Sequence, residues 1–127
     1  MQLTPDCIRD VLLELETFPM GAYKASAFCN CLEKYSNEQI LYTLIKLYEG
    51  HYVNAVFKRS SSGIPIIFHV YDITFQGHEF LESIKSDTIW NQHIKPVAEK
   101  VGSKSFEAIT QIASSVITTL ITNCLSV

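Results

Sequence analysis

Residues 36–81 read SNEQILYTLIKLYEGHYVNAVFKRSSSGIPIIFHVYDITFQGHEFL, and this stretch decides the fold. Ser36 is followed three residues later by Gln39, so the two side chains can satisfy each other's backbone donors in a capping box. Apolar side chains then recur at helical spacing as far as Tyr48. We expect Gly50 to end this helix in the left-handed conformation that glycine adopts easily.

Two runs typical of β-strands follow this helix, Tyr52 to Lys58 and Ile66 to Ile73. The seven residues between them, RSSSGIP, are rich in serine and contain a glycine and a proline. This pattern predicts a β-hairpin with a long tip. Thr74 is placed to cap a further helix that carries Phe80 and Leu81.

A helix, a hairpin and another helix in this order predict an α+β fold, the winged helix-turn-helix, with a two-stranded wing hairpin. Residues 73–81 resemble the Leu-Thr-x-x-Gly-x-x-Phe-Leu run of many bacterial winged-helix proteins. Together with 7–16, 35–40, 47–50 and 77–90, they resemble an uncharacterised family of small bacterial and prophage proteins, known only as a domain of unknown function. That resemblance implies a winged helix over about the first hundred residues, and it implies no activity and no catalytic residue.

The segment before residue 36 should supply the rest of the winged-helix core. Thr4, Pro5 and Asp6 provide a capping hydroxyl, a proline and a first-turn carboxylate, which together favour a helix start. Residues 23–25 suit the short strand that pairs with the hairpin in winged folds. We expect a helix over 27–34, and an irregular loop is the alternative.

Two additional helices are predicted after residue 86, so 1–86 would form the winged-helix domain and 87–127 a helical extension of the same compact unit. Asp87 can cap the first of these helices, and Pro96 should interrupt or restart it. In the last helix, apolar residues recur at alternating spacings of three and four, which predicts a homodimer seam. The seam residues are Phe106, Ile109, Ala113, Val116 and Leu120.

Residues 108–127 contain no charged side chain, which raises the question of a membrane span. Several threonine, serine and amide side chains dilute the segment, and no basic or aromatic belt follows it. We therefore expect a buried or dimer-forming helix and no membrane insertion.

Composition narrows the possible functions. A chain of 127 residues is one domain by size, and its net charge of −3 argues against a strongly electrostatic nucleic-acid binder. No secretory leader opens the sequence, so we expect a cytoplasmic protein with reduced thiols. Cys29 and Cys31 are separated by one residue, which is not the spacing of a zinc or redox motif.

The first functional hypothesis is a DNA-binding regulator. In the helix-turn-helix geometry, the helix after the turn enters the major groove of double-stranded DNA, and the wing meets phosphates or the minor groove. The candidate nucleic-acid-binding residues are Gln39, Tyr42, Thr43 and Lys46 on the helix, with Lys58 and Arg59 on the wing. Glu38 and Glu49 share the helix, so a merely solvated surface is the alternative interpretation of this face.

The second hypothesis is a non-enzymatic protein-binding module. The acidic balance of the chain and its long apolar last helix suit association with protein better than with phosphate. The prophage resemblance extends this to a phage-encoded inhibitor of a bacterial defence complex.

An enzyme is the third class, and the sequence argues against it. His78 and Glu79 resemble the start of a zinc-protease motif, but Glu82 occupies the position of the second histidine. No glycine-rich phosphate loop is present. We therefore predict no catalytic residue, no metal and no cofactor.

Overall fold

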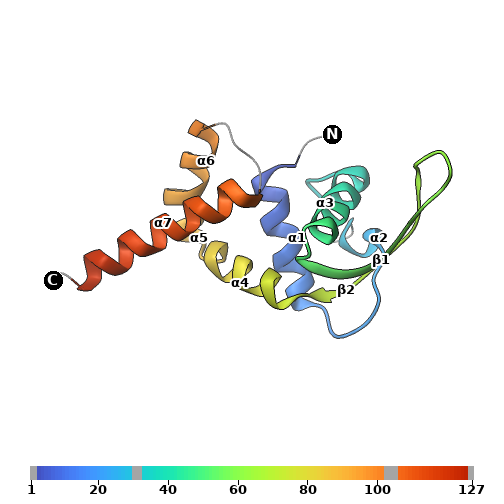
Figure 1. Ribbon diagram of the computed structural model, residues 1–127, viewed down its shortest axis with the longest axis horizontal. Helices are drawn as coiled ribbons and strands as arrows, with labels where there is room; N and C mark the ends of the chain where they lie inside the picture. The colour runs from blue at the N-terminus through green and yellow to red at the C-terminus, as the bar shows by residue number, and fades with distance from the viewer. Residues whose placement is uncertain (1–2, 30–32, 102–105, 126–127) are drawn as a thin grey trace. The chain divides into compact units, whose positions relative to one another are not determined.

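The computed structural model describes residues 3–29, 33–101 and 106–125. It is a mixed α+β fold in which helices accompany one antiparallel hairpin, β1–β2 (Figure 1). The elements are α1 Pro5–Thr17, α2 Ala25–Cys29, α3 Asn37–Glu49, β1 Val53–Arg59, β2 Pro65–Ile73, α4 Phe75–Ile84, α5 Asp87–Ile89, the π-helical turn η1 Trp90–Ile94, α6 Lys95–Val101 and α7 Phe106–Leu125.

Contacts divide the chain into an N-terminal unit, Met1–His78, and a C-terminal unit, Glu79–Val127. The dividing point falls within α4. The division predicted from the sequence, 1–86 and 87–127, stays a prediction, because a change in contact density does not show which segments fold on their own.

Side-chain caps start the two main helices of the N-terminal unit, as predicted. The Thr4 hydroxyl accepts a hydrogen bond from the backbone N–H of Cys7 at 3.4 Å, and the Ser36 hydroxyl accepts one from that of Gln39 at 3.1 Å. Each cap satisfies one of the free amides that every helix leaves at its start. Pro5 at the beginning of α1 adds a backbone angle already suited to a helix.

The prediction that Gly50 ends α3 in the left-handed conformation is wrong. Gly50 has a φ of −82°, and the left-handed residue is His51, with a φ of 66°. The amide of His51 donates to the Tyr48 carbonyl and the amide of Tyr52 to the Leu47 carbonyl. This is a Schellman motif, in which the left-handed position lies one residue beyond the cap, so the geometry falls on histidine and not on glycine.

The hairpin pairs Val53 with Ile73 and Phe57 with Phe68. A single antiparallel bridge joins Tyr23 to Val70, through two hydrogen bonds of 2.8 Å. The extended segment predicted at 23–25 is therefore right at Tyr23 and wrong at Ala25, which begins α2. The predicted helix over 27–34 is only partly right. It begins two residues earlier, at Ala25, and residues 33 and 34 lie in a turn.

The core of the N-terminal unit lies where α3 packs against α1 and α2. Its fully buried side chains belong to all three helices and to β2: Ile8, Val11, Leu12, Phe28, Ile40, Leu44, Leu47 and Val70. Because α3 has neighbours on two sides, only part of its circumference remains exposed. That exposed part and the hairpin form the candidate site described below.

The C-terminal unit is built around buried Trp90 and Ile94. Ser86 caps α5 by accepting the Ile89 amide at 3.3 Å, so the cap predicted at Asp87 is wrong by one residue. Pro96 lies just after the π-helical turn, whose wider hydrogen bond runs from the Lys95 amide to the Trp90 carbonyl. Proline has no amide to donate, and the wider turn accommodates that loss while the helix continues.

Within the described ranges, no helix combines the length and the hydropathy needed to cross a membrane.

Candidate functional site

The N-terminal unit contains a groove of about 430 Å³ between α3 and the tip of the hairpin. Its α3 side carries the apolar side chain of Ile45 and the half-exposed Leu41 and Tyr42. Ile64 and Pro65 face them from the hairpin, and Ile64 is 64% exposed. The floor of the groove is therefore apolar.

Two cations meet one carboxylate beside this floor. Lys46 Nζ lies 2.9 Å from Glu49 Oε2, and Arg59 Nη2 lies 3.9 Å from Glu49 Oε1. Lys46 also lines the groove from α3, and Arg59 lines it from the hairpin. Side chains that are 13 positions apart in the sequence, 46 and 59, thus converge on Glu49.

Neighbouring groups hold these cations in place. The guanidinium of Arg59 lies 4.8 Å from the ring centre of Phe57 and donates to the Gly63 carbonyl at 3.0 Å. Lys46 Nζ lies 5.4 Å from the ring centre of Tyr42. All three charged side chains are between 31% and 45% exposed, so water screens their ion pairs. A competing anion could replace Glu49 at small cost.

Thr43 does not belong to the exposed face, and its prediction as a DNA contact is wrong. It is fully buried, and its hydroxyl donates to the Gln39 carbonyl at 2.8 Å and lies 3.3 Å from Cys7 Sγ on α1. Threonine commonly bonds back to the carbonyl four residues earlier, which lets a hydroxyl enter an apolar interface. This packing against α1 is a long-range contact that the helical periodicity does not reveal.

The remaining candidates divide between the groove and its surroundings. Tyr42, Lys46 and Arg59 line the groove, whereas half-exposed Gln39 and exposed Lys58 lie outside its lining. The apolar residues of the groove were not among the predicted site residues. The sequence feature that could have indicated them is the pair Leu41 and Ile45. These two apolar residues are four positions apart on α3, beside the face that packs in the core.

A partly buried hydrogen-bond cluster connects the chain before α3 to α1. The Tyr35 hydroxyl donates to Asp10 Oδ2 at 2.6 Å, and Lys34 Nζ lies 2.8 Å from the same oxygen. Burial, and next the bond to Asp10, raise the pKa of Tyr35 well above its usual range. Burial likewise raises the pKa of the Cys7 thiol. The Tyr35–Asp10 hydrogen bond and the Cys7–Thr43 contact thus connect α3 and the chain before it to α1.

No metal centre is formed by the residues that the structure describes, among which no three His, Cys, Asp or Glu side chains gather. The side chains of Cys29 and Cys31 lie outside the described part.

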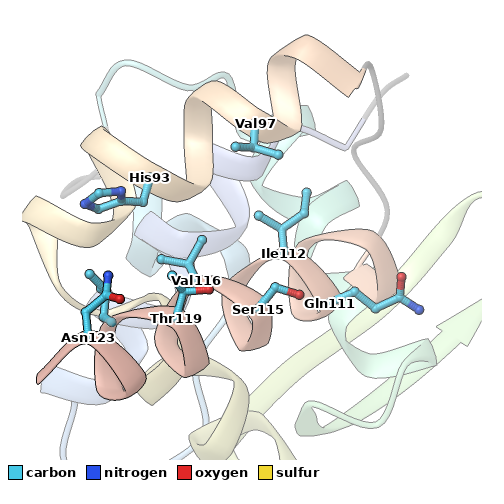
Figure 2. A pocket seen from close by; sticks show the side chains of 9 residues that line it. His93, Val97, Gln111, Ile112, Ser115, Val116, Thr119 and Asn123 are labelled. Carbon is cyan, nitrogen blue, oxygen red and sulfur yellow. The ribbon is translucent and has the colours of Figure 1, made fainter. Parts of the chain in front are cut away.

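The predicted dimer seam of α7 falls into two halves. Ile109 and Ala113 are fully buried within the chain, so their prediction as dimer contacts is wrong. Val116 and Leu120 are half-buried and line a second groove, of about 590 Å³, between α7 and the α6 side of the C-terminal unit (Figure 2). The side chain of Phe106 lies outside the described residues. A regular seam pattern could not show that the first half packs inside the chain.

These features define a small α+β protein in which a helix and a two-stranded hairpin enclose an apolar groove with a charged rim. The chain belongs to the family described as Hypothetical protein (DUF2513), whose model matches residues 2–104. This confirms the resemblance to a family of unknown function. The chain is also similar to an uncharacterized protein of Haemophilus influenzae, 28% identical over 116 residues that cover 91% of this chain and 95% of that relative. No solved structure matches the chain.

Proposed function

We propose that the N-terminal unit is a winged helix and that the chain is a cytoplasmic, non-enzymatic DNA-binding regulator. The element order supports the fold: α3 packs on α1 and α2, the hairpin follows, and the Tyr23–Val70 bridge adds a third extended segment. The bacterial relative agrees with a bacterial or prophage origin.

The observation that carries the proposal is the convergence of Lys46 and Arg59 on Glu49. It brings a cation of the proposed recognition helix and a cation of the proposed wing to one end of a groove. In the helix-turn-helix geometry, α3 would enter the major groove, where Lys46 can donate to guanine acceptors and Gln39 can pair with adenine. Arg59 would exchange Glu49 for a backbone phosphate.

Selection from random duplex DNA, followed by affinity measurements on the selected site, tests this proposal. Lys46→Ala should weaken specific binding by about 1–3 kcal/mol, the usual value of a base contact. Lys85→Ala is the matched control, because Lys85 makes a similar i,i+3 contact, 3.7 Å from Glu82, outside the proposed site. Its affinity should equal that of the wild type. Failure to select any sequence at low salt, or equal losses in both variants, would refute the proposal.

The apolar floor of the groove favours a second candidate, a protein-binding module. Leu41, Tyr42 and Ile45 face Ile64 and Pro65, and these side chains suit an apolar peptide segment better than a phosphate backbone. A phage-encoded inhibitor of a bacterial defence complex is one such module. Leu41→Ser should abolish binding of a protein partner, whereas Lys46→Ala should be the more damaging change if the ligand is DNA.

A further inference from the structure

The C-terminal half of α7 carries an apolar surface that its own chain leaves partly uncovered. On the same helix face, Ala113 lies about one turn before Ile117 and Ile109 about two turns before it, and both are fully buried. From Val116 onward, the same side of the helix lines two grooves. Leu120 is half-buried there, and Ile121 is 54% exposed. The apolar face of α7 therefore continues beyond the core that covers its first half.

We define this α7 patch as Val116, Ile117, Leu120, Ile121 and Cys124. These positions follow i, i+1, i+4, i+5 and i+8, so they form one broad helix face. The groove on one side of α7 is lined only by four members of the patch and by Ile89 of α5. The groove on the other side, which Figure 2 shows, includes Val116 and Leu120.

We infer that the α7 patch is an interface between two copies of this chain. Charge supports a second copy over a partner that binds through charged groups. After Glu107, α7 contains no Asp, Glu, Lys or Arg, so two chains that each carry a net charge of −3 can meet here without opposing like charges. A partner that recognises charge would find nothing to pair with.

The symmetry of the patch supports the same choice and sets the geometry. In a two-fold contact the same surface is used by both copies, so the surface must complement itself. Leu120 is the midpoint between Val116 and Cys124. An antiparallel pair of helices with its axis at Leu120 therefore sets Leu120 against Leu120, and Val116 against Cys124, of the second copy. Among antiparallel pairings, one with its axis near this midpoint covers the complete patch on both chains.

The inference does not rest on the proposed DNA binding, and the mass of the full chain in solution tests it. Sedimentation equilibrium should give twice the 14.4 kDa of one chain. Ile121→Asp should raise the dissociation constant by at least about a hundredfold, since a two-fold contact repeats the change. The matched control is Ile64→Asp, at a side chain 64% exposed in the N-terminal unit, which should remain dimeric.

Cysteine cross-linking tests the position of the axis. In a background with serine at 29 and 31, Leu120→Cys combined with Cys124→Ser should form a disulfide-linked dimer. Native Cys124 should not, because two positions four residues from the axis are separated by about 12 Å along the helix, beyond the reach of a disulfide. Cys124→Lys, at an exposed position, gives a second disrupting variant that can fold normally.

Each outcome decides the matter. A mass of one chain at all concentrations, or a dimer that survives both Ile121→Asp and Cys124→Lys, would overturn the interface. Cross-linking through native Cys124, with or without cross-linking through Leu120→Cys, would overturn the antiparallel pairing about Leu120, and so would a failure of Leu120→Cys to cross-link.

Discussion

Gly77→Ala should destabilise the N-terminal unit, because Gly77 lies near the start of α4 against the backbone of Tyr52, the residue before β1. A Cβ added at Gly77 would lie 2.1 Å from the Tyr52 carbonyl oxygen and 2.6 Å from Ile73 Cγ2. The same carbonyl accepts the Thr74 amide at 3.0 Å, so it cannot turn away without breaking that hydrogen bond. This close approach gives a physical reason for glycine in the Gly77-x-x-Phe80-Leu81 run.

The size of the effect follows from these distances. Moving the Tyr52 carbonyl from 2.1 Å to 3.0 Å, the closest distance that real Cβ atoms show, requires a shift of about 0.9 Å between backbone segments. Such overpacking costs about 1–3 kcal/mol, and loss of the Thr74 hydrogen bond adds about 1 kcal/mol. Alanine recovers about 1 kcal/mol through its better helix propensity. The net loss should be about 1–3 kcal/mol.

Urea unfolding of the full chain, followed by circular dichroism, measures this loss as a lower midpoint at an unchanged slope. Gly21→Ala is the control, since its new Cβ would meet only the side chain of Tyr23, at 3.2 Å. The Tyr23 side chain has to give way by only a few tenths of an ångström, so we expect a change within about 0.5 kcal/mol. If Gly77→Ala unfolds at the same urea concentration as Gly21→Ala, the close contact with the Tyr52 carbonyl does not exist in solution.

Three further experiments test the end of α3, the accessibility of two cysteines and the Tyr35 hydroxyl. His51→Gly should raise the free energy of unfolding by about 0.5–1 kcal/mol, because glycine adopts the left-handed φ without strain, and an unchanged urea midpoint would contradict this. A thiol reagent followed by peptide mapping should label exposed Cys124 and spare Cys7, which is buried and has a raised pKa; fast labelling of Cys7 would show that the α1–α3 contact opens. The folded state holds the Tyr35 proton to higher pH than the unfolded state does, so stability should be complete below about pH 10 and fall above it. In Tyr35→Phe this alkaline fall in the urea midpoint should be smaller, and an identical fall would refute the assignment.

Local signals predicted local structure well. The caps at Thr4 and Ser36 and the pairing of the hairpin strands depend on residues close together in the sequence, and the structure confirms them. The errors also have local causes. Ser86 and Asp87 are both good caps in adjacent positions, and a Schellman ending differs from a simple glycine ending by the position of one residue.

The candidate site was harder to predict because distant residues build it. Helical periodicity placed Lys46 on the exposed side of α3, and the two strand-like runs placed Arg59 in the hairpin. Neither pattern indicates that both side chains meet Glu49. Thr43 shows the reverse error, since a polar residue on a predicted polar face is buried against Cys7. Long-range packing decides both cases.

The small number of cations in the proposed site limits how strongly one chain could hold DNA. A dimer through the α7 patch would double that number. Lys46, Lys58 and Arg59 are three cations, and each neutralised phosphate contributes about −0.9 to the slope of log K against log salt. A single chain should therefore show a slope no steeper than about −2.7, whereas a symmetric pair on two half-sites should approach about −5.4. Affinity measured across salt concentrations, for wild type and Ile121→Asp, separates these cases. Halving of the slope in the variant would show that an acidic chain binds DNA by acting as a pair. Equal slopes would mean that one chain makes all the phosphate contacts.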